Sequence, residues 1–219
     1  MPQPIESPTP DDVVRRALAL KADMDSSEAA MVATYVRLLV RWNEKMNLVG
    51  PTAWEDILED LVLDSLHLAR FVSTLDLPAE PLTIDLGAGA GLPGIPLRIF
   101  WRAGRYLLVE TRAKRVAFME QALRNLDLPD TRAIRSRVED LTLPESGADL
   151  VLSRAFRPWP DFLELARPLL TPTGLALVMA SGPIPAELPA GWEPAGSMIY
   201  PSPSGRRWFW AMSPIMAPS

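Results

Sequence analysis

Apolar residues in the first third of the chain recur at the three- and four-residue spacing of amphipathic helices. Three stretches carry this pattern, at residues 11–20, 26–49 and 53–72. Acidic residues open the first stretch, and a serine at position 26 or 27 is the expected N-cap of the second. Before them lies a polar, acidic start. We therefore expect a disordered lead over residues 1–10 and an N-terminal helical cap over residues 11–75.

Beyond residue 76 the pattern changes to short apolar strands that alternate with helices. The expected strands cover residues 82–86, 106–110, 132–137, 148–156 and 174–180, with helices at 93–101, 112–128 and 160–170. This alternation predicts a parallel, doubly wound sheet, so residues 76–219 are expected to form one Rossmann-like α/β domain. At its end, the segments 196–200 and 206–212 flank the turn residues PSPSG and predict an antiparallel hairpin at the sheet edge.

Composition narrows the class of protein. The 219 residues suffice to bury a sizeable core, and 48% of them are hydrophobic, as in a globular protein. The absence of cysteine excludes disulfides, thiolate metal sites and thiol nucleophiles, and a single histidine argues against histidine-based metal sites and serine triads. The start is unlike a signal peptide, and no apolar run approaches 18 residues. These features predict a cytoplasmic protein with neither a metal site nor a membrane-spanning segment.

The net charge of −5 argues against wholesale nucleic-acid binding but leaves room for a local basic face. Six cations cluster in the region of the first α/β unit, namely Arg98, Arg102, Arg105, Arg112, Lys114 and Arg115. They indicate either a patch for RNA phosphates or a solvated helical face that balances nearby acids. Trp208 and Trp210 occupy alternate positions of the last predicted strand, which indicates core packing on one face of the sheet.

The stretch TIDLGAGAGLPGIP, residues 83–96, joins a predicted strand to a helix through a glycine-rich turn. Such a turn lets the backbone approach a ligand closely. Gly87, Gly89 and Gly91 match the GxGxG loop that many S-adenosylmethionine (SAM) enzymes carry, whereas Gly89, Gly91 and Gly94 match the GxGxxG fingerprint of dinucleotide-binding folds. The loop alone does not decide between these two ligands.

Acidic residues near the ends of successive strands favour SAM. Asp85 lies two residues before Gly87, where a carboxylate would repel a pyrophosphate but suit the sulfonium and ammonium groups of SAM; alternatively, it caps the next helix. Glu110 closes the second strand, where an acid accepts hydrogen bonds from ribose hydroxyls. Glu139 follows the third strand and either meets the adenine edge or caps a turn. Because ligands bind at the carboxyl ends of parallel strands, this set predicts SAM and leaves Gly94 for helix packing.

Several strings of the sequence resemble one known family and follow its order. They are WNEKMNLVG, LVLDSL, IDLGAGAGLPGIPL, KRVAFM, SRVED and LSRAF, and they resemble the RsmG (GidB) methyltransferases across residues 35–182. The resemblance implies SAM-dependent methylation of guanine N7 in 16S ribosomal RNA, a class I methyltransferase fold, and that RNA or a small-subunit particle as partner. We expect the protein to act as a monomer. The resemblance further implies SAM contacts from Gly87, Leu92, Val138, Glu139 and Arg154, ribose binding by Glu110, and a substrate-pocket position for Asn43.

The chain departs from the family at positions where cations would meet RNA or the target base. The family usually carries an Arg-His pair where this chain has Asp60 and Leu61, and a lysine at the end of the fifth strand, where this chain has Ala180 followed by serine and glycine. SAM binding is therefore better supported than the RNA substrate. Arg154 follows the fourth strand and either orients SAM or holds the target base, unless it pairs with a neighbouring acid.

The implied reaction needs little acid–base chemistry. Guanine N7 has a free lone pair, so catalysis would rest on proximity and orientation, which supply about 7–11 kcal/mol in favourable systems. Asn43 and Arg154 are the candidate catalytic residues, whereas His67 is expected to be structural or solvated. Two other classes of function stay open. One is a methyltransferase of the same fold that acts on a small molecule or a protein, and the other is a non-catalytic SAM- or nucleotide-binding module or an NAD-linked oxidoreductase.

Overall fold

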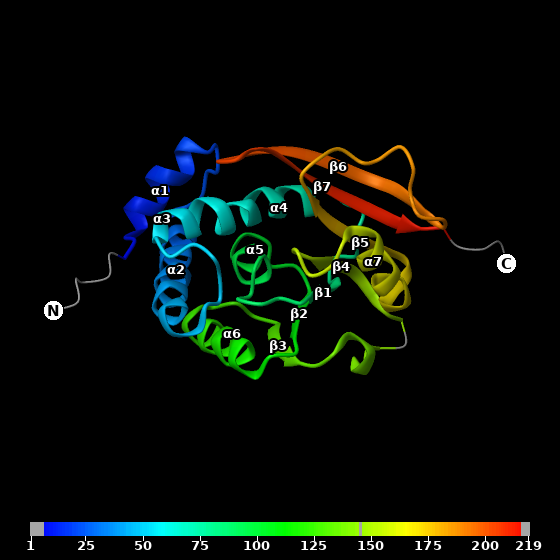
Figure 1. Ribbon diagram of the computed structural model, residues 1–219, viewed down its shortest axis with the longest axis horizontal. Helices are drawn as coiled ribbons and strands as arrows, with labels where there is room; N and C mark the ends of the chain where they lie inside the picture. Colours follow the sequence, from blue (N-terminus) through cyan, green and yellow to red (C-terminus); the bar gives the residue numbers. More distant parts are fainter. Residues whose placement is uncertain (1–6, 145, 216–219) are drawn as a thin grey trace.

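The structure is a computed structural model that describes residues 7–144 and 146–215. Its centre is a seven-stranded sheet in the order β3-β2-β1-β4-β5-β7-β6 (Figure 1). The strands are β1 (Leu82–Leu86), β2 (Arg105–Glu110), β3 (Thr131–Arg135), β4 (Ala148–Ser153), β5 (Leu170–Ala180), β6 (Trp192–Ser202) and β7 (Gly205–Pro214). Strands β1 to β5 pair in parallel, and β7 and β6 are antiparallel additions. The predicted parallel sheet with a C-terminal hairpin is confirmed.

Helices cover both faces of the sheet. They are α1 (Pro10–Ala19), α2 (Ser26–Met46), α3 (Trp54–Ile57), η1 (Leu58–Val62), α4 (Asp64–Val72), α5 (Gly94–Phe100), α6 (Ala113–Asn125), η2 (Val138–Asp140), α7 (Trp159–Ala166) and η3 (Arg167–Leu169). The N-terminal helices pack with α5 and α6 in one core, and α7 packs in a second core on the other face. In the described part of the chain, no helix combines the length and the apolar character needed to cross a bilayer.

The first two helices begin with capping boxes that the sequence analysis did not place. Thr9 is the N-cap of α1, where its side chain and that of Asp12 each bond the backbone N–H of the other residue. Helix α1 and its cap therefore begin within residues 1–10, where a disordered lead was expected, and residues 1–6 of that lead lie outside the described residues. Asp25 caps α2 through the same reciprocal arrangement with Glu28, so neither serine is the N-cap.

The third predicted helix is interrupted by a π-helical turn. Residues 54–57 are α-helical, but in η1 the backbone hydrogen bonds span five residues instead of four. Leu63, for example, donates its N–H to the Leu58 carbonyl at 3.0 Å. Helix α4 then continues from Asp64. Such wide turns occur frequently at functional sites.

Arg98 stands at the end of the sheet opposite the carboxyl ends of the strands and is almost fully buried. Its five N–H donors are all used, by the Thr131 hydroxyl and by the carbonyls of Trp101, Ala103, Gly104 and Pro129. Burial excludes Arg98 from an RNA-binding patch. The predicted cluster of six cations is also divided, because β2 runs between Arg105 at its start and Arg112 beyond its end.

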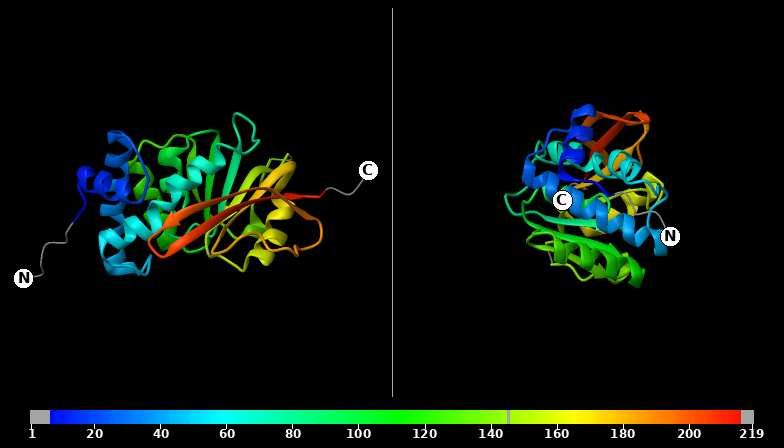
Figure 2. Two further views of the ribbon diagram at one scale, coloured as in Figure 1. Left: turned by 90° about the horizontal axis from the view of Figure 1, so that it is seen from above. Right: turned by 90° about the vertical axis from the view of Figure 1, so that its left-hand side faces the viewer.

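The C-terminal hairpin lies along α4 at the edge of the molecule (Figures 1 and 2). Tyr200 of β6 stacks on His67 of α4, with ring centroids 5.3 Å apart, and on Phe209 of β7 at 4.3 Å. His67 is therefore a buried packing residue, and burial lowers its pKa below the usual value. Trp208 and Trp210 contribute to the core on the α7 face, as predicted.

Candidate active site

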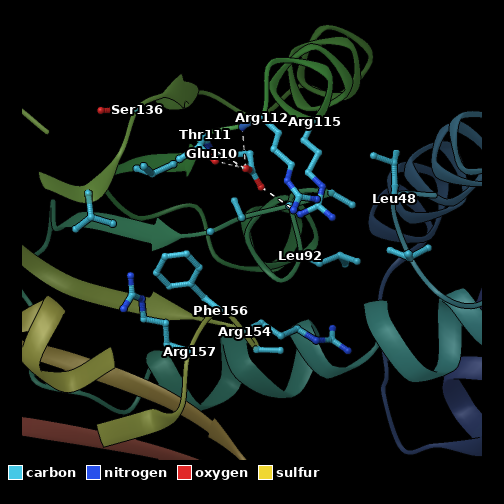
Figure 3. Close-up of a pocket in the computed structure, with 18 of the residues that line it drawn as sticks. Leu48, Leu92, Glu110, Thr111, Arg112, Arg115, Ser136, Arg154, Phe156 and Arg157 are labelled. Atoms are coloured by element: carbon cyan, nitrogen blue, oxygen red, sulfur yellow. Dashed lines mark hydrogen bonds and ion pairs between the residues drawn. The ribbon is translucent and has the colours of Figure 1, made fainter. Parts of the chain in front are cut away.

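A cavity of about 780 Å³ opens at the carboxyl ends of β1, β2, β3 and β4 (Figure 3). Its wall consists of residues at or beyond the ends of these strands, at 87–90, 92, 109–112, 136–139 and 154–157, and of residues 48–51 beyond α2. Side chains at the carboxyl ends of parallel strands meet at one edge of the sheet, which is where such sheets bind ligands. Residues far apart in the sequence are thereby brought to one site.

The glycine loop presents bare backbone to this cavity. Gly87 and Gly89 have φ angles of +68° and +59°, which favour glycine. A Cβ on Gly89 would meet the Arg115 guanidinium at 3.6 Å and nothing closer, whereas a Cβ on Gly87 would lie 2.4 Å from the Phe156 ring. The loop is closed by the Ala88 N–H, which donates to the Val109 carbonyl of β2 at 3.0 Å.

Glu110 ends β2 with its carboxylate fixed against the first turn of α6. Its Oε1 accepts hydrogen bonds from the backbone N–H groups of Thr111 and Arg112 at 2.8 and 2.9 Å. Its Oε2 faces the Arg115 guanidinium at 3.4 Å (Figure 3). Burial alone would raise the pKa of Glu110, but these hydrogen bonds and the Arg115 charge outweigh it and hold the pKa below its usual value. Glu110 is therefore an ionised acceptor on the cavity wall, and its Oε2 has Arg115 as its one partner among the described residues.

Two further walls complete the cavity. Val138 and Glu139 lie on η2, which follows β3, and Glu139 is exposed to solvent. Arg154 follows β4, and its guanidinium donates to the carbonyls of Leu61 at 2.7 Å and Asp60 at 3.0 Å, both in η1. The same guanidinium lies 3.8 Å from the carboxylate of Asp64. Arg154 thus ties the end of β4 to the π-helical turn, using carbonyls that the wide turn leaves free.

Positive charge predominates around the cavity. Five arginines line it, namely Arg112, Arg115, Arg137, Arg154 and Arg157, against the two carboxylates Glu110 and Glu139. Arg112, Arg137 and Arg157 are exposed. A negatively charged partner is therefore attracted to this edge although the whole chain carries a net charge of −5.

Comparison with known proteins gives the family. The model of the family described as "GidB: rRNA small subunit methyltransferase G" matches residues 28–188, which is more than half of the chain. The chain belongs to the GidB family. The resemblance drawn from the sequence strings is therefore confirmed.

Curated relatives of this GidB-family chain cover nearly all of it. A protein of Nitratidesulfovibrio vulgaris (strain DP4) is 46% identical over 86% of each chain, and one of Lawsonia intracellularis is 39% identical over 95% of this chain and 98% of its own. Both are named "Ribosomal RNA small subunit methyltransferase G". Among solved structures, M. jannaschii TYW2 in complex with AdoMet has a TM-score of 0.51 at 15% identity and covers 69% of this chain and 76% of its own. That likeness supports the Rossmann-like methyltransferase fold.

Most of the predicted cofactor residues of the GidB-family chain line the cavity. These are Gly87, Gly89, Leu92, Glu110, Val138, Glu139 and Arg154. Gly91 does not line it: its φ of +75° forms the turn, and a Cβ there would lie 2.5 Å from Ile95. Gly94 packs against β2, since a Cβ on it would meet Leu108 at 2.3 Å, which agrees with the predicted role in helix packing.

Asp85 is placed beneath the glycine loop rather than on the cavity wall. The residue is fully buried within β1, and its Oδ2 accepts a hydrogen bond at 3.1 Å from the Gly94 N–H at the start of α5. This is the helix-capping alternative rather than a position beside a ligand. The reason is geometric: alternate side chains of a strand point to opposite faces of the sheet, and that of Asp85 points under α5. Burial raises the pKa of Asp85 well above its usual value, despite that hydrogen bond and the Arg154 charge.

Replacing Asp85 by Asn is expected to alter how stability depends on pH. Because the pKa is higher in the folded than in the unfolded state, the folded protein binds this proton more tightly, and the free energy of unfolding falls as pH rises between the two values. Each unit of difference in pKa corresponds to about 1.4 kcal/mol. Urea unfolding of Asp85→Asn and of the unmodified protein between pH 5 and pH 9 measures the effect, with the variant gaining relative stability as pH rises. Parallel pH profiles would contradict it.

Asn43 supports the cavity wall from behind. It is 5% exposed and does not line the cavity. Its Nδ2 donates to the Pro51 carbonyl, and its Oδ1 accepts from the Val49 N–H, both at 2.9 Å. The side chain therefore fixes the segment 48–51, which does line the cavity, and the structure places Asn43 behind the pocket that the family resemblance implied.

Asn43→Ala is expected to lower the free energy of unfolding by about 1–3 kcal/mol, because it leaves two polar groups of the segment 48–51 without their partner. Hydrogen exchange of the Val49 amide should accelerate. The Leu63 amide, which donates to Leu58 in the π-helical turn, serves as the control that stays protected. An unchanged exchange rate at Val49 would show that Asn43 does not hold this segment.

Sequence reasoning did not single out two residues of the cavity. Phe156 is 37% exposed and covers Gly87, and Arg157 lies over its ring at 5.6 Å. Ala155, just before them, has a φ of +52°, an uncommon conformation for a residue with a Cβ. The string SRAF indicated that this segment is part of the site. It did not predict the turn at Ala155 that places Phe156 and Arg157 at the cavity.

Proposed function

We propose that this chain is a SAM-dependent methyltransferase that methylates N7 of a guanine in 16S ribosomal RNA of the small ribosomal subunit, in the cytoplasm. The observation that carries the proposal is the cavity itself, in which bare glycine backbone and an ionised carboxylate face each other from neighbouring strands. The family and the names of its curated members support the class of reaction and of substrate.

The residues of the cavity fit SAM. Gly89 leaves open space where a side chain would stand, so a ligand can lie against the loop. Glu110 offers an acceptor oxygen suited to the two ribose hydroxyls, and η2 supplies Val138 and Glu139 for the adenine edge. The family of the chain, rather than the charge of the cavity, favours SAM over a dinucleotide.

The proposed reaction suits a site without a general base. SAM supplies a methyl group that the sulfonium charge makes electrophilic. Guanine N7 carries no hydrogen, so no residue has to remove a proton from it. The cavity lining contains no histidine, lysine or tyrosine, and its carboxylate Glu110 is held ionised by Arg115 and by backbone N–H groups. The task of the chain is therefore to bind and orient the two reactants and to exclude water.

The arginines of the cavity support an RNA substrate. Although the family's Arg-His pair is absent at Asp60 and Leu61, the carbonyls of these residues receive the Arg154 guanidinium. Exposed Arg112 and Arg137 are positioned for phosphate contacts, which position RNA without reading its sequence.

Mapping of N7-methylguanine tests the proposal. Small-subunit RNA from cells that lack the gene is compared with RNA from the same cells carrying the gene on a plasmid, by chemical cleavage at N7-methylguanine and primer extension. One guanine of 16S ribosomal RNA is expected to lose its methyl group and to regain it on complementation. Calorimetry with SAM and NAD complements the test, with binding of SAM alone expected. Unchanged methylation would favour a small-molecule or protein substrate, and preference for NAD would overturn the reaction class.

A further inference from the structure

A second cavity of about 350 Å³ adjoins the first. The two share Ala155 and Arg157, so the segment 154–157 forms the partition between them. The second cavity lies at the carboxyl ends of β4 and β5 and is closed beneath by Trp210 of β7. Its volume falls at the lower end of the range of about 300–1,000 Å³ that ligand pockets span.

Aromatic and small side chains line the second cavity, together with the hydroxyl groups of Ser153 and Ser181. Trp159, Phe162 and Trp210 contribute three aromatic rings, and Arg157 is the one charged residue among those that line it. Trp159 is half-buried and meets Trp210 edge to face at 5.6 Å. Trp210 is held in place because its Nε1 donates to the Gly182 carbonyl at 3.1 Å. The three rings therefore offer a stacking surface to a flat ligand.

Arg157 is available to such a ligand. It is exposed, it lies over the Phe156 ring at 5.6 Å, and it takes part in none of the ion pairs found among residues 7–144 and 146–215. A guanidinium donates readily to O6 of guanine, which is the acceptor next to N7. The strand end at Ala180 also lines this cavity and carries no cation, so Arg157 supplies the positive charge there.

We propose that the second cavity receives the purine base to be methylated, turned out of a single-stranded stretch of RNA, with Trp159 as its stacking surface and Arg157 as its donor partner. The inference rests on the proposed function. Enzymes that modify a base in RNA take it out of the stack and hold it between aromatic or apolar side chains. Because the two cavities share Ala155 and Arg157, a base held in the second lies beside the first.

Substitution of Trp159 tests the stacking surface. Methyl transfer to small-subunit particles from cells lacking the gene is measured for the unmodified protein, Trp159→Ala and Trp159→Phe. Trp159→Ala is expected to lower kcat/KM for RNA about tenfold or more, and Trp159→Phe, which keeps a ring, to recover most of it. The dissociation constant for SAM and the melting temperature should hold in Trp159→Phe, since Trp159 does not line the first cavity. Trp101→Ala is the matched control, because Trp101 is also half-buried but precedes β2 at the opposite end of the sheet.

A second set of variants fills the second cavity, or removes the positive charge of Arg157 and places one at position 181 instead. A Cβ on Gly182 would meet no atom within 4 Å, so Gly182→Leu should fold normally and yet lower RNA methylation while SAM affinity holds. Arg157→Ala should also weaken methylation, and adding Ser181→Lys to it should restore part of the rate. Wild-type rates in Trp159→Ala and Gly182→Leu, or equal losses in SAM binding, would overturn the inference while the proposed function stands. An unmodified protein that binds SAM but leaves the particles unmethylated would overturn the proposed function instead.

Discussion

Gly89→Val is expected to abolish SAM binding while the protein remains folded. The Gly89 backbone has a φ of +59° and faces the cavity without a side chain. A valine there would place two methyl groups in the space that the ligand needs, so we expect an affinity loss of more than about 100-fold, or 2.8 kcal/mol. The left-handed backbone adds a cost of about 1–2 kcal/mol in stability. Titration calorimetry with SAM measures the first effect and thermal unfolding the second.

Gly89→Ala separates these two contributions. Alanine is also strained in the left-handed backbone, though less than β-branched valine, and adds only one methyl group, which would stand 3.6 Å from the Arg115 guanidinium. Its melting temperature should fall by somewhat less than that of the valine variant, with a much smaller loss of SAM affinity. Wild-type SAM affinity in Gly89→Val would mean that the loop is only a turn between β1 and α5.

Arg154→Ala is expected to destabilise the protein by about 3 kcal/mol and to lower SAM affinity at the same time. The variant leaves the carbonyls of Asp60 and Leu61 without their donor and the buried carboxylate of Asp64 without its positive neighbour. Leu61 itself lines the cavity, so release of the π-helical turn would alter the wall. Chemical unfolding and calorimetry with SAM, on the same preparation, measure both effects.

Two companion variants identify the cause of these losses. Arg154→Lys keeps a positive charge near Asp64 but lacks the planar fork that spans two carbonyls, so it should recover only part of the stability. Adding Asp64→Asn to Arg154→Ala removes the unpaired charge and should restore part of the stability without restoring SAM affinity. If the double variant regained both, the guanidinium would not act on the cavity directly.

The site residues that could be predicted from the sequence are those at the carboxyl ends of the parallel strands. Glu110 and Glu139 could be predicted because each lies at or just beyond the carboxyl end of a parallel strand, and those ends must share one edge. Asp85 differs because it lies within its strand, where the two-residue alternation decides its direction and α5 covers it. The sequence shows an acidic residue at both positions, but it does not show whether the side chain points under a helix or towards the cavity.

The rest of the site depends on contacts that leave no pattern in the sequence. The π-helical turn adds one residue to the ladder, too small a change for the apolar spacing of residues 53–72 to reveal. The partners of Arg154 are main-chain carbonyls, which any residue type provides. The second cavity depends on where Trp210 of β7 comes to lie beside β5, which is a pairing between segments about 30 residues apart.

The cavity joins the ends of four strands between Gly87 and Arg157, and this has a thermodynamic consequence. A ligand that needs all four ends in place binds only the folded chain, so its binding energy is added to the free energy of unfolding. At a concentration 100 times the dissociation constant the gain is about 2.7 kcal/mol. In a cell, this addition to the free energy of unfolding lowers the fraction of unfolded chains that proteases can cleave. The supply of methyl donor would thus determine how long each copy of the protein survives.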